Sequence, residues 1–392
     1  MDFIAGTFNS PFLYNLSFDP KTEKLSIKHT NDAISGHSWL SFSPDQTILY
    51  CTAWTEPDPS IAAYRVLASQ KLELINSVPV SFRPGYICAS RTHVYAVGGP
   101  EGGAYQVRED GGIGEQVQKL DFVTRDVNMS EKRGEVAHGD FGGLRHGAHS
   151  CDLSPDGKTL YVADIGRNCV WVYGVGTNAA NSTGSPNEDH LVLHHKSIAP
   201  RTYDGPRHAW PHPNGEVVYS VQEHSSMVDA FRIQRDAQGN ISNLVHLSGV
   251  NILPESEHHG EFWADEVRLS SGPDASKPEY LYASTRGLEA KTKGYVAVFK
   301  LNEDGTFAKD KALNIWQTPT SGGIANAIEP APWHESGVQY LAMTDSLDGT
   351  VSILKFDGQI QQVDLLKLPY GDGINGHANA VVQAATAVWF SK

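Results

Sequence analysis

The sequence has few cysteines, few charged residues and no long apolar run. Its four cysteines form no CxxC pair and no dense pattern of the kind that cross-links small secreted domains. Charged residues make up 19% of the 392 residues, and no stretch approaches the roughly 20 apolar residues of a transmembrane helix. We therefore expect thiols in a reducing compartment and no membrane span.

Basic residues are also scarce. The chain has 31 Lys and Arg against 45 Asp and Glu, a formal net charge of −14, which repels nucleic acid and anionic membranes. Residues 1–7 lack the basic and apolar segments of a secretory signal. The sequence thus predicts a cytoplasmic protein that binds neither nucleic acid nor membrane, and it is compatible with a homo-oligomer as well as a monomer.

Glycine and proline, by contrast, are abundant, and they punctuate a repeat. The 37 Gly and 21 Pro suit many short strands joined by tight turns, and no long stretch keeps a helical period. Segments 38–54, 149–165 and 207–223 each contain an alternating strand, a Pro-Asp or Pro-Asn turn and a second strand that carries a tyrosine. These segments predict β-hairpins.

Similar strands continue along the chain. Further strands or strand pairs are expected at 91–98 with 103–107, 170–175, 228–233, 279–285 with 295–301, and 339–345 with 350–356. About seven units of the length of propeller blades result. The predicted fold is all-β, a seven-bladed β-propeller formed as a single domain by residues 1–392.

The chain ends and two polar segments complete this prediction. Strands at 3–8 and 380–390 are expected to share one blade and close the ring, because a free terminal strand would leave an unpaired edge. Segments 121–143 and 176–191 are polar and rich in Gly, Ser or Asn, so we expect long loops there.

Equivalent positions of the repeat point to a site. In a propeller, the start of the first strand of a blade and the end of its second strand lie on the same rim. The first-strand position contains Ser38, His149 and Arg207, and the second-strand position contains Trp54, Ile165, Glu223 and Arg286. Other blades have Ser, Trp or Ile at these two positions, so the fold does not require a charged or titratable residue there. The residues that depart from this pattern therefore indicate a functional site. The alternative is a structural ion pair of Glu223 with Arg207 or Arg286.

Other motifs argue against several kinds of chemistry. The His-rich segments 146–149 and 258–261 lack HExxH spacing on a helix, so we expect no zinc site there. No Asp/Glu spacing encloses a hard cation, although a propeller can gather ligands from separate blades. A GxSxG elbow and a Walker lysine motif are both absent, which excludes covalent serine catalysis of that type and P-loop nucleotide hydrolysis.

At these same residues the chain resembles the fungal 3-carboxy-cis,cis-muconate lactonizing enzymes, also called carboxy-cis,cis-muconate cyclases, within the 6-phosphogluconolactonase-like propellers. The likeness runs along nearly the whole chain and is carried by segments 147–164, 205–223, 280–287, 294–301 and 317–328. Its more specific elements are His149, Pro206-Arg207, Glu223 and Ser284-Thr285-Arg286, in this order.

The resemblance implies a reaction and roles for these residues. A small polycarboxylate, (3-carboxy-)cis,cis-muconate, would be converted to a muconolactone in aromatic catabolism by the β-ketoadipate pathway, with no metal and no cofactor. His149 and Glu223 would be catalytic, and Arg207 and Arg286 would bind substrate as carboxylate forks. His149 is the expected acid because its ordinary pKa lies near neutrality. Glu223 either orients His149 or an arginine, or moves the proton itself.

One departure from the family and two rival functions stay open. Ile324 stands where the family pattern TSGGHSN has its His, which removes a polar contact and leaves the exact substrate undecided. The first rival is a lactonase that hydrolyses a sugar or phosphosugar lactone, which residue types do not distinguish from a cyclase. The second is a noncatalytic interaction propeller, whose surface would favour exposed aromatic and aliphatic anchors over a titratable cluster.

Overall fold

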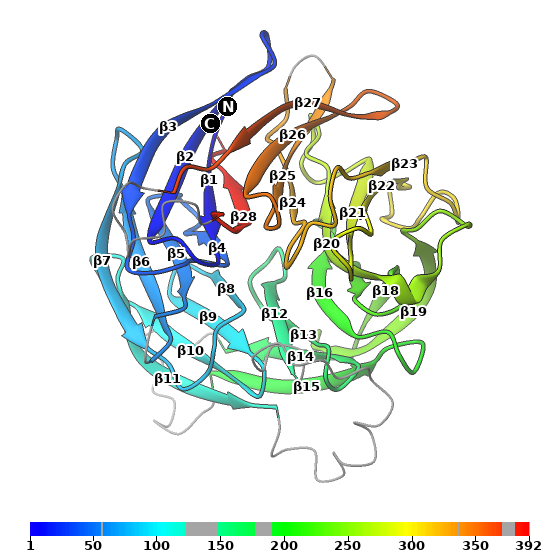
Figure 1. Ribbon diagram of the computed structural model, residues 1–392. Coiled ribbons are helices and arrows are strands. Elements are labelled where there is room, and N and C mark those ends of the chain that lie inside the picture. Colours follow the sequence, from blue (N-terminus) through cyan, green and yellow to red (C-terminus); the bar gives the residue numbers. More distant parts are fainter. Residues whose placement is uncertain (56–57, 123–146, 177–189, 335–336, 371–380, 392) are drawn as a thin grey trace.

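Seven four-stranded antiparallel sheets stand around a common axis, which confirms the predicted seven-bladed β-propeller (Figure 1). The structure, a computed structural model, describes residues 1–55, 58–122, 147–176, 190–334, 337–370 and 381–391. The innermost strands of neighbouring blades contact one another around the ring. Within the described ranges, no helix has the length and apolar character needed to cross a bilayer.

The strands of a blade succeed one another from the axis of the ring outward. From innermost to outermost, blade 1 has β28 (Ala384–Trp389), β1 (Asp2–Thr7), β2 (Phe12–Asp19) and β3 (Lys24–Asp32). Blade 2 has β4 (Leu40–Phe42), β5 (Ile48–Ala53), β6 (Ser60–Val66) and β7 (Leu72–Pro79). Blade 3 has β8 (Tyr86–Ala89), β9 (His93–Gly98), β10 (Glu101–Val107) and β11 (Ile113–Asp121). Blade 4 has β12 (Ala148–Leu153), β13 (Thr159–Asp164), β14 (Cys169–Val175) and β15 (Leu191–Ile198).

The remaining blades follow the same order. Blade 5 has β16 (Pro206–Pro211), β17 (Val217–Gln222), β18 (Met227–Arg235) and β19 (Ile241–Asn251). Blade 6 has β20 (Phe262–Leu269), β21 (Tyr280–Gly287), β22 (Tyr295–Lys300) and β23 (Asn314–Gln317), preceded by a short 3-10 helix, η3 (His259–Glu261). Blade 7 has β24 (Ile328–Pro330), β25 (Gln339–Asp345), β26 (Thr350–Phe356) and β27 (Ile360–Lys367).

Blade 1 is built from both ends of the chain. Its innermost strand β28 pairs antiparallel with β1, with Phe3 opposite Trp389 and Ile4 opposite Val388. The two termini lie close together in Figure 1. This pairing removes the unpaired edge that either terminal strand would otherwise present. The segments expected as loops, 121–143 and 176–191, fall largely on residues 123–146 and 177–189, which lie outside the described part of the chain.

The repeated hairpin turns form because their acidic or amide side chains hold the local backbone. Asp45 Oδ1 accepts hydrogen bonds from the Thr47 N–H at 3.2 Å and from Ser43 Oγ at 2.7 Å. Asp156 makes the equivalent bonds in blade 4, and Asn214 Oδ1 accepts from the Glu216 N–H in blade 5. The turns thus use the Asx geometry that the sequence pattern predicts.

Two of the three repeat tyrosines, Tyr50 and Tyr219, link their blades to the next one. Tyr50 and Tyr219 are buried on their second strands, and each hydroxyl donates to a backbone carbonyl in a turn of the following blade, Gly111 or Gly305. A buried tyrosine thereby contributes apolar contact area and keeps its polar end satisfied. All four cysteines are buried thiols on strands of blades 2 to 4.

Candidate active site

One backbone hydrogen bond in each blade closes the innermost strand against the second strand. The N–H donors are Ser43, Ser90, Ser154, His212, Ser270, Ala331 and Phe390. Counting five residues back from each donor gives one equivalent residue per blade: Ser38, Gly85, His149, Arg207, Asp265, Asn326 and Ala385. The sequence identified this first-strand position in three repeats. In the structure it occurs once in each of the seven blades, and the seven residues form a ring around the axis.

Local irregularities in the strands direct three of these side chains. The register between first and second strand shifts at His149, at Arg207 and at Asp265, in blades 4, 5 and 6. Such a bulge inserts an extra residue and re-aims its side chain away from the regular ladder. All three residues line the same pocket.

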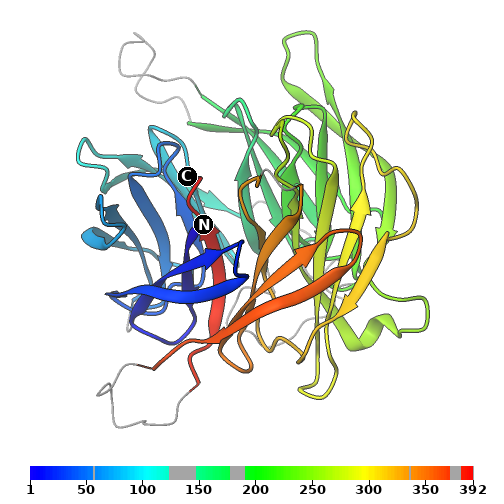
Figure 2. The same ribbon diagram turned by 90° about the horizontal axis from the view of Figure 1, so that it is seen from above.

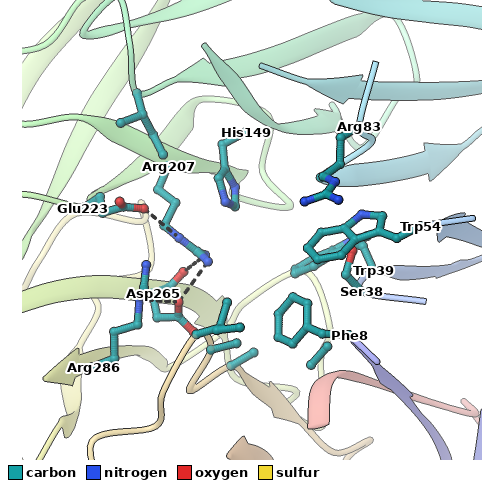
Figure 3. Close-up of a pocket in the computed structure, with 16 residues that line it drawn as sticks. Phe8, Ser38, Trp39, Trp54, Arg83, His149, Arg207, Glu223, Asp265 and Arg286 are labelled. Atoms are coloured by element: carbon teal, nitrogen blue, oxygen red, sulfur yellow. Dashed lines mark hydrogen bonds and ion pairs between the residues drawn. The ribbon is translucent and has the colours of Figure 1, made fainter. Parts of the chain in front are cut away.

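The pocket has a volume of about 260 Å³ and contains every residue that the repeat alignment placed on the rim: Ser38, Trp54, His149, Ile165, Arg207, Glu223 and Arg286. The structure therefore brings the four candidate site residues together, from three neighbouring blades (Figure 3). Ile324, which the sequence analysis singled out as a departure from the family, also lines the pocket. Sequence reasoning missed the other lining residues, Phe8, Trp39, Arg83, Gly85, Asp265, Ala325, Ala327 and Ala385.

Arg207 is almost fully engaged by protein groups. Its Nε donates to Glu223 Oε2 at 3.1 Å, and its Nη2 lies 2.9 Å from Asp265 Oδ1. Its Nη1 donates to His208 Nε2 at 2.9 Å and to the backbone carbonyl of Asp265. Because a guanidinium has five N–H groups, Arg207 has one left for a ligand. The ion pair with Glu223 foreseen from the sequence exists, and it forms part of the pocket wall.

A buried network behind the pocket holds Arg207 in this position. Since Arg207 can only donate, His208 Nε2 accepts, and His208 Nδ1 therefore donates to Glu266 Oε1 at 2.6 Å. Arg268 pairs with the same Glu266 and, at 2.7 Å, with Glu329. Burial raises the pKa of Glu266 to about 7 and that of Glu329 to about 6. The interlocked contacts fix the guanidinium before any ligand arrives.

Arg286 is buried but much less engaged. Its Nη1 donates to the Gly323 carbonyl at 3.3 Å, and its Nε lies 3.6 Å from Asp265 Oδ1. The guanidinium lies over the ring of Trp263, 5.1 Å from its centre. Burial lowers the pKa of Arg286 despite the nearby carboxylates. Most of its N–H groups remain available for an anion, so Arg286 can act as an open carboxylate fork.

His149 differs from the sequence expectation in its protonation. Burial first, and then Arg207, His208 and Arg286, hold the pKa of His149 well below its usual value. With only protein charges around it, the imidazole is neutral at pH 7, and it cannot be an imidazolium acid until a negative charge enters the pocket. The sequence expectation of a group titrating near neutrality needs this correction, because burial and the two arginines are not visible in a motif.

Four polar atoms of the pocket residues lack hydrogen-bond partners. Within the described ranges, His149 Nδ1, Glu223 Oε1, Asp265 Oδ1 and Arg286 Nε are buried and make no hydrogen bond, although the last two take part in ion pairs. Unsatisfied buried polar atoms are rare in native proteins and point to a bound ligand or water. Glu223 orients Arg207 rather than His149, since its hydrogen bond goes to the guanidinium.

Asp265 was missed although its strand carries a recognisable pattern. Residues 265–270 match 149–154 and 207–212 in spacing, each stretch ending at the residue whose N–H closes the hairpin. The turn of this blade extends from Ser270 to Tyr280, so it lacks the short turn that served as the alignment point. Counting back 12 residues from Tyr282, the spacing from the tyrosine to the first-strand position in the other repeats, reaches Ser270, so the longer turn hides Asp265 from the repeat.

The His-rich segment before β20 has local structural roles. His258 Nδ1 accepts a hydrogen bond from the Gly260 N–H at 3.2 Å, and His259 Nδ1 bonds the Ser225 carbonyl at 2.7 Å. In the part of the chain that the structure describes, no three His, Cys, Asp or Glu side chains are grouped as metal ligands.

Comparisons with known proteins agree with this architecture. Residues 2–319 match the family described as lactonase, seven-bladed β-propeller. The chain is 42% identical to muconate cycloisomerase 1 of Cutaneotrichosporon cutaneum over 394 residues, which cover 99% of this chain and 98% of that protein. It is 28% identical over 239 residues to carboxy-cis,cis-muconate cyclase of Neurospora crassa, covering 58% of this chain and 59% of the other. The solved structure of a periplasmic gluconolactonase from Pseudomonas aeruginosa has the same fold, with a TM-score of 0.72, 18% identity and coverage of 99% and 98%.

Proposed function

The chain belongs to the seven-bladed β-propeller lactonase family, and from this premise we propose that it is a cycloisomerase that converts cis,cis-muconate into a muconolactone without a metal or cofactor. The observation that carries the proposal is a pocket lined both by an open guanidinium, Arg286, and by a neutral imidazole, His149, whose Nδ1 makes no hydrogen bond with the described residues. The 42% identity to a muconate cycloisomerase over nearly the whole chain supports it. The reaction is a step of aromatic catabolism, and we place it in the cytoplasm.

The proposed reaction is an internal addition. An oxygen of the C1 carboxylate bonds to C4, and the π electrons of the C4–C5 double bond move toward the C6 carboxylate, which becomes an enediolate. A proton then adds to C5, so the muconate dianion becomes the muconolactone monoanion by gaining one proton, and the two free acids are isomers. This sequence needs cations where negative charge accumulates, and an acid beside C5.

The pocket residues can meet both needs. Arg286 offers its open N–H groups to the C6 carboxylate, whose charge grows during the addition. The substrate dianion offsets the positive field that lowers the pKa of His149, so the imidazole gains a proton on binding and delivers it to C5. Arg207 keeps Glu223 and Asp265 in place and contributes one N–H. Glu223 Oε1 makes no hydrogen bond within the described residues and can accept the proton that leaves C5 in the reverse reaction.

Residue 324 favours unsubstituted muconate over 3-carboxymuconate. Ile324, Ala325 and Ala327 form an apolar part of the wall, next to the Gly323 carbonyl that Arg286 contacts. A third carboxylate against this wall would lose its hydration without gaining a cation, which is unfavourable. In the family pattern that the sequence resembles, a histidine is expected where this chain has Ile324.

Incubating the pure protein with cis,cis-muconate and with 3-carboxymuconate tests the proposal. Loss of diene absorbance is followed with and without EDTA. We expect rapid loss with muconate, slower loss with the carboxylated diene, and no effect of EDTA. Stable absorbance with both dienes would contradict the proposal and favour a lactonase, which hydrolysis of gluconolactone would then reveal. Inhibition by EDTA would contradict a metal-free reaction.

A further inference from the structure

A third arginine lies across the pocket from the charged wall. Arg83, just before β8, extends its guanidinium over the ring of Trp54, 4.8 Å from the ring centre (Figure 3). The indole Nε1 of Trp54 donates to the Pro84 carbonyl at 2.9 Å, which ties the ring to the segment that carries Arg83. The aromatic face thus supports the cation at the pocket wall.

The three pocket arginines differ in how their charges are compensated. Arg207 contacts two carboxylates and is 8% exposed. Arg286 has one carboxylate, Asp265, at 3.6 Å. No residue of the described ranges forms a hydrogen bond or an ion pair with the Arg83 guanidinium. The lining residues therefore carry three guanidiniums against two carboxylates, and the uncompensated charge is that of Arg83.

Arg83 also departs from the repeat. It lies two residues before Gly85, the first-strand position of blade 3. The blades on either side have glycine at the equivalent place, Gly36 and Gly147, where a Cβ would clash with a backbone carbonyl. Blade 3 instead accommodates the longest basic side chain there, and that side chain faces the pocket.

We propose that Arg83 binds the second carboxylate of the substrate, so that a dicarboxylate spans the pocket between Arg83 and Arg286. A guanidinium and a carboxylate form a bidentate, charge-assisted pair. Phe8, Trp54 and Ile324, which line the pocket, offer an apolar surface to the carbon chain between the two ends. The assignment of Arg83 to the C1 carboxylate rests on the proposed function, whereas the preference for a dicarboxylate does not.

The chemistry predicts how the loss of Arg83 would show in the kinetics. The C1 carboxylate loses its negative charge as it becomes the lactone ester, so its attraction to Arg83 is no greater in the transition state than in the ground state. Removing such an interaction raises KM and leaves kcat nearly unchanged. Arg286, which faces the growing charge, affects kcat as well.

Two saturated acids measure the proposal without any turnover. Adipate and hexanoate share a six-carbon chain and differ by one carboxylate, and calorimetry gives their affinities for the wild-type protein and for Arg83→Met. We expect wild type to prefer adipate by about 10- to 100-fold, from the usual strength of charged hydrogen bonds. Arg83→Met should lose that preference while its affinity for hexanoate stays the same. Arg91→Met, an exposed arginine after β8 at the far end of the same strand, is the matched control and should behave as wild type.

Kinetics with cis,cis-muconate complete the test. Arg83→Met should raise KM by about 10- to 100-fold with kcat within about threefold of wild type, and Arg83→Lys should recover part of the loss. An adipate preference that survives in Arg83→Met, or is missing in wild type, overturns the assignment of Arg83. Preference for adipate without any turnover of muconate keeps Arg83 as a carboxylate-binding residue and contradicts the proposed function instead.

Discussion

Two arcs of the same ring of residues differ sharply in chemistry. In blades 4, 5 and 6 the first-strand position contains His149, Arg207 and Asp265, whereas in blades 1, 2 and 3 it contains Ala385, Ser38 and Gly85. The view along the axis in Figure 1 and the view from above in Figure 2 show the blades of both arcs around one axis. The charged arc supplies reactive groups, and the arc of small residues leaves the space in which a substrate can lie.

The backbone is not the source of this difference. A register shift occurs beside Ala385 as it does at His149, so the bulge is not confined to the charged arc. The two arcs differ in the types of residue that occupy equivalent backbone positions. The fold supplies the ring, and the side chains of one arc supply the chemistry.

The largest expected effect comes from removing the centre of the charged arc. Arg207→Met leaves Glu223, 2% exposed, and Asp265, 0% exposed, without their main cation. Breaking a buried ion pair in this way costs about 3–5 kcal/mol, and we expect turnover to disappear. Urea unfolding measures the loss of stability, and the diene assay measures the loss of turnover. Ser38→Ala, at the equivalent place in the other arc, loses a single hydrogen bond to Thr52, about 1 kcal/mol. Equal losses in the two variants would contradict the division into two arcs.

Replacing the imidazole separates catalysis from binding. His149→Ala should lower kcat by about 10²- to 10⁴-fold, as expected for the loss of a general acid. Its affinity for adipate should stay close to that of wild type, because the guanidiniums carry the binding. Near-normal turnover of this variant in the diene assay would remove His149 from the mechanism.

Arg286→Gln tests the guanidinium whose N–H groups remain available for a substrate carboxylate. Because Arg286 faces the charge that grows in the transition state, both a higher KM and a lower kcat are expected, with kcat reduced by about 10²- to 10³-fold. Steady-state kinetics with muconate give the two values separately. A rise in KM with unchanged kcat would assign Arg286 to ground-state binding alone.

The smallest effect is on stability and concerns pH. The folded-state pKa of His149 is held well below its ordinary value of 6.5, so below about pH 6.5 the unfolded chain binds more protons than the folded protein. The free energy of unfolding then decreases as pH falls, by at most about 1.4 kcal/mol per pH unit for one group. In His149→Gln this contribution is absent. From pH 7.5 to 5.5 the free energy of unfolding should therefore decrease more in wild type than in the variant. Urea unfolding at both pH values measures it, and parallel curves would show that His149 is not held neutral.

The sequence could predict where the site lies, but only part of what it does. The repeat revealed His149, Arg207, Glu223 and Arg286, because equivalent positions of other blades have an uncharged residue such as Ser, Trp or Ile. Asp265 escaped because its blade has a longer turn.

Of the charge compensation in the pocket, only the ion pair of Arg207 with Glu223 was foreseen from the sequence. The full engagement of Arg207 depends on His208, on Glu223 of a neighbouring strand and on Asp265 of the next blade, which meet only in the folded protein. The neutral state of His149 depends in the same way on burial and on two arginines from other strands. Motifs give residue types, whereas the protonation and availability of those residues come from packing.

The isotopic composition of the product tests the central claim most directly. The reaction of cis,cis-muconate is run once in D₂O and once in H₂¹⁸O, and the lactone is analysed by NMR and mass spectrometry. An internal addition followed by protonation predicts one deuterium at C5 and no ¹⁸O in the lactone. A product that carries ¹⁸O from water, or that lacks deuterium at C5, would contradict the account.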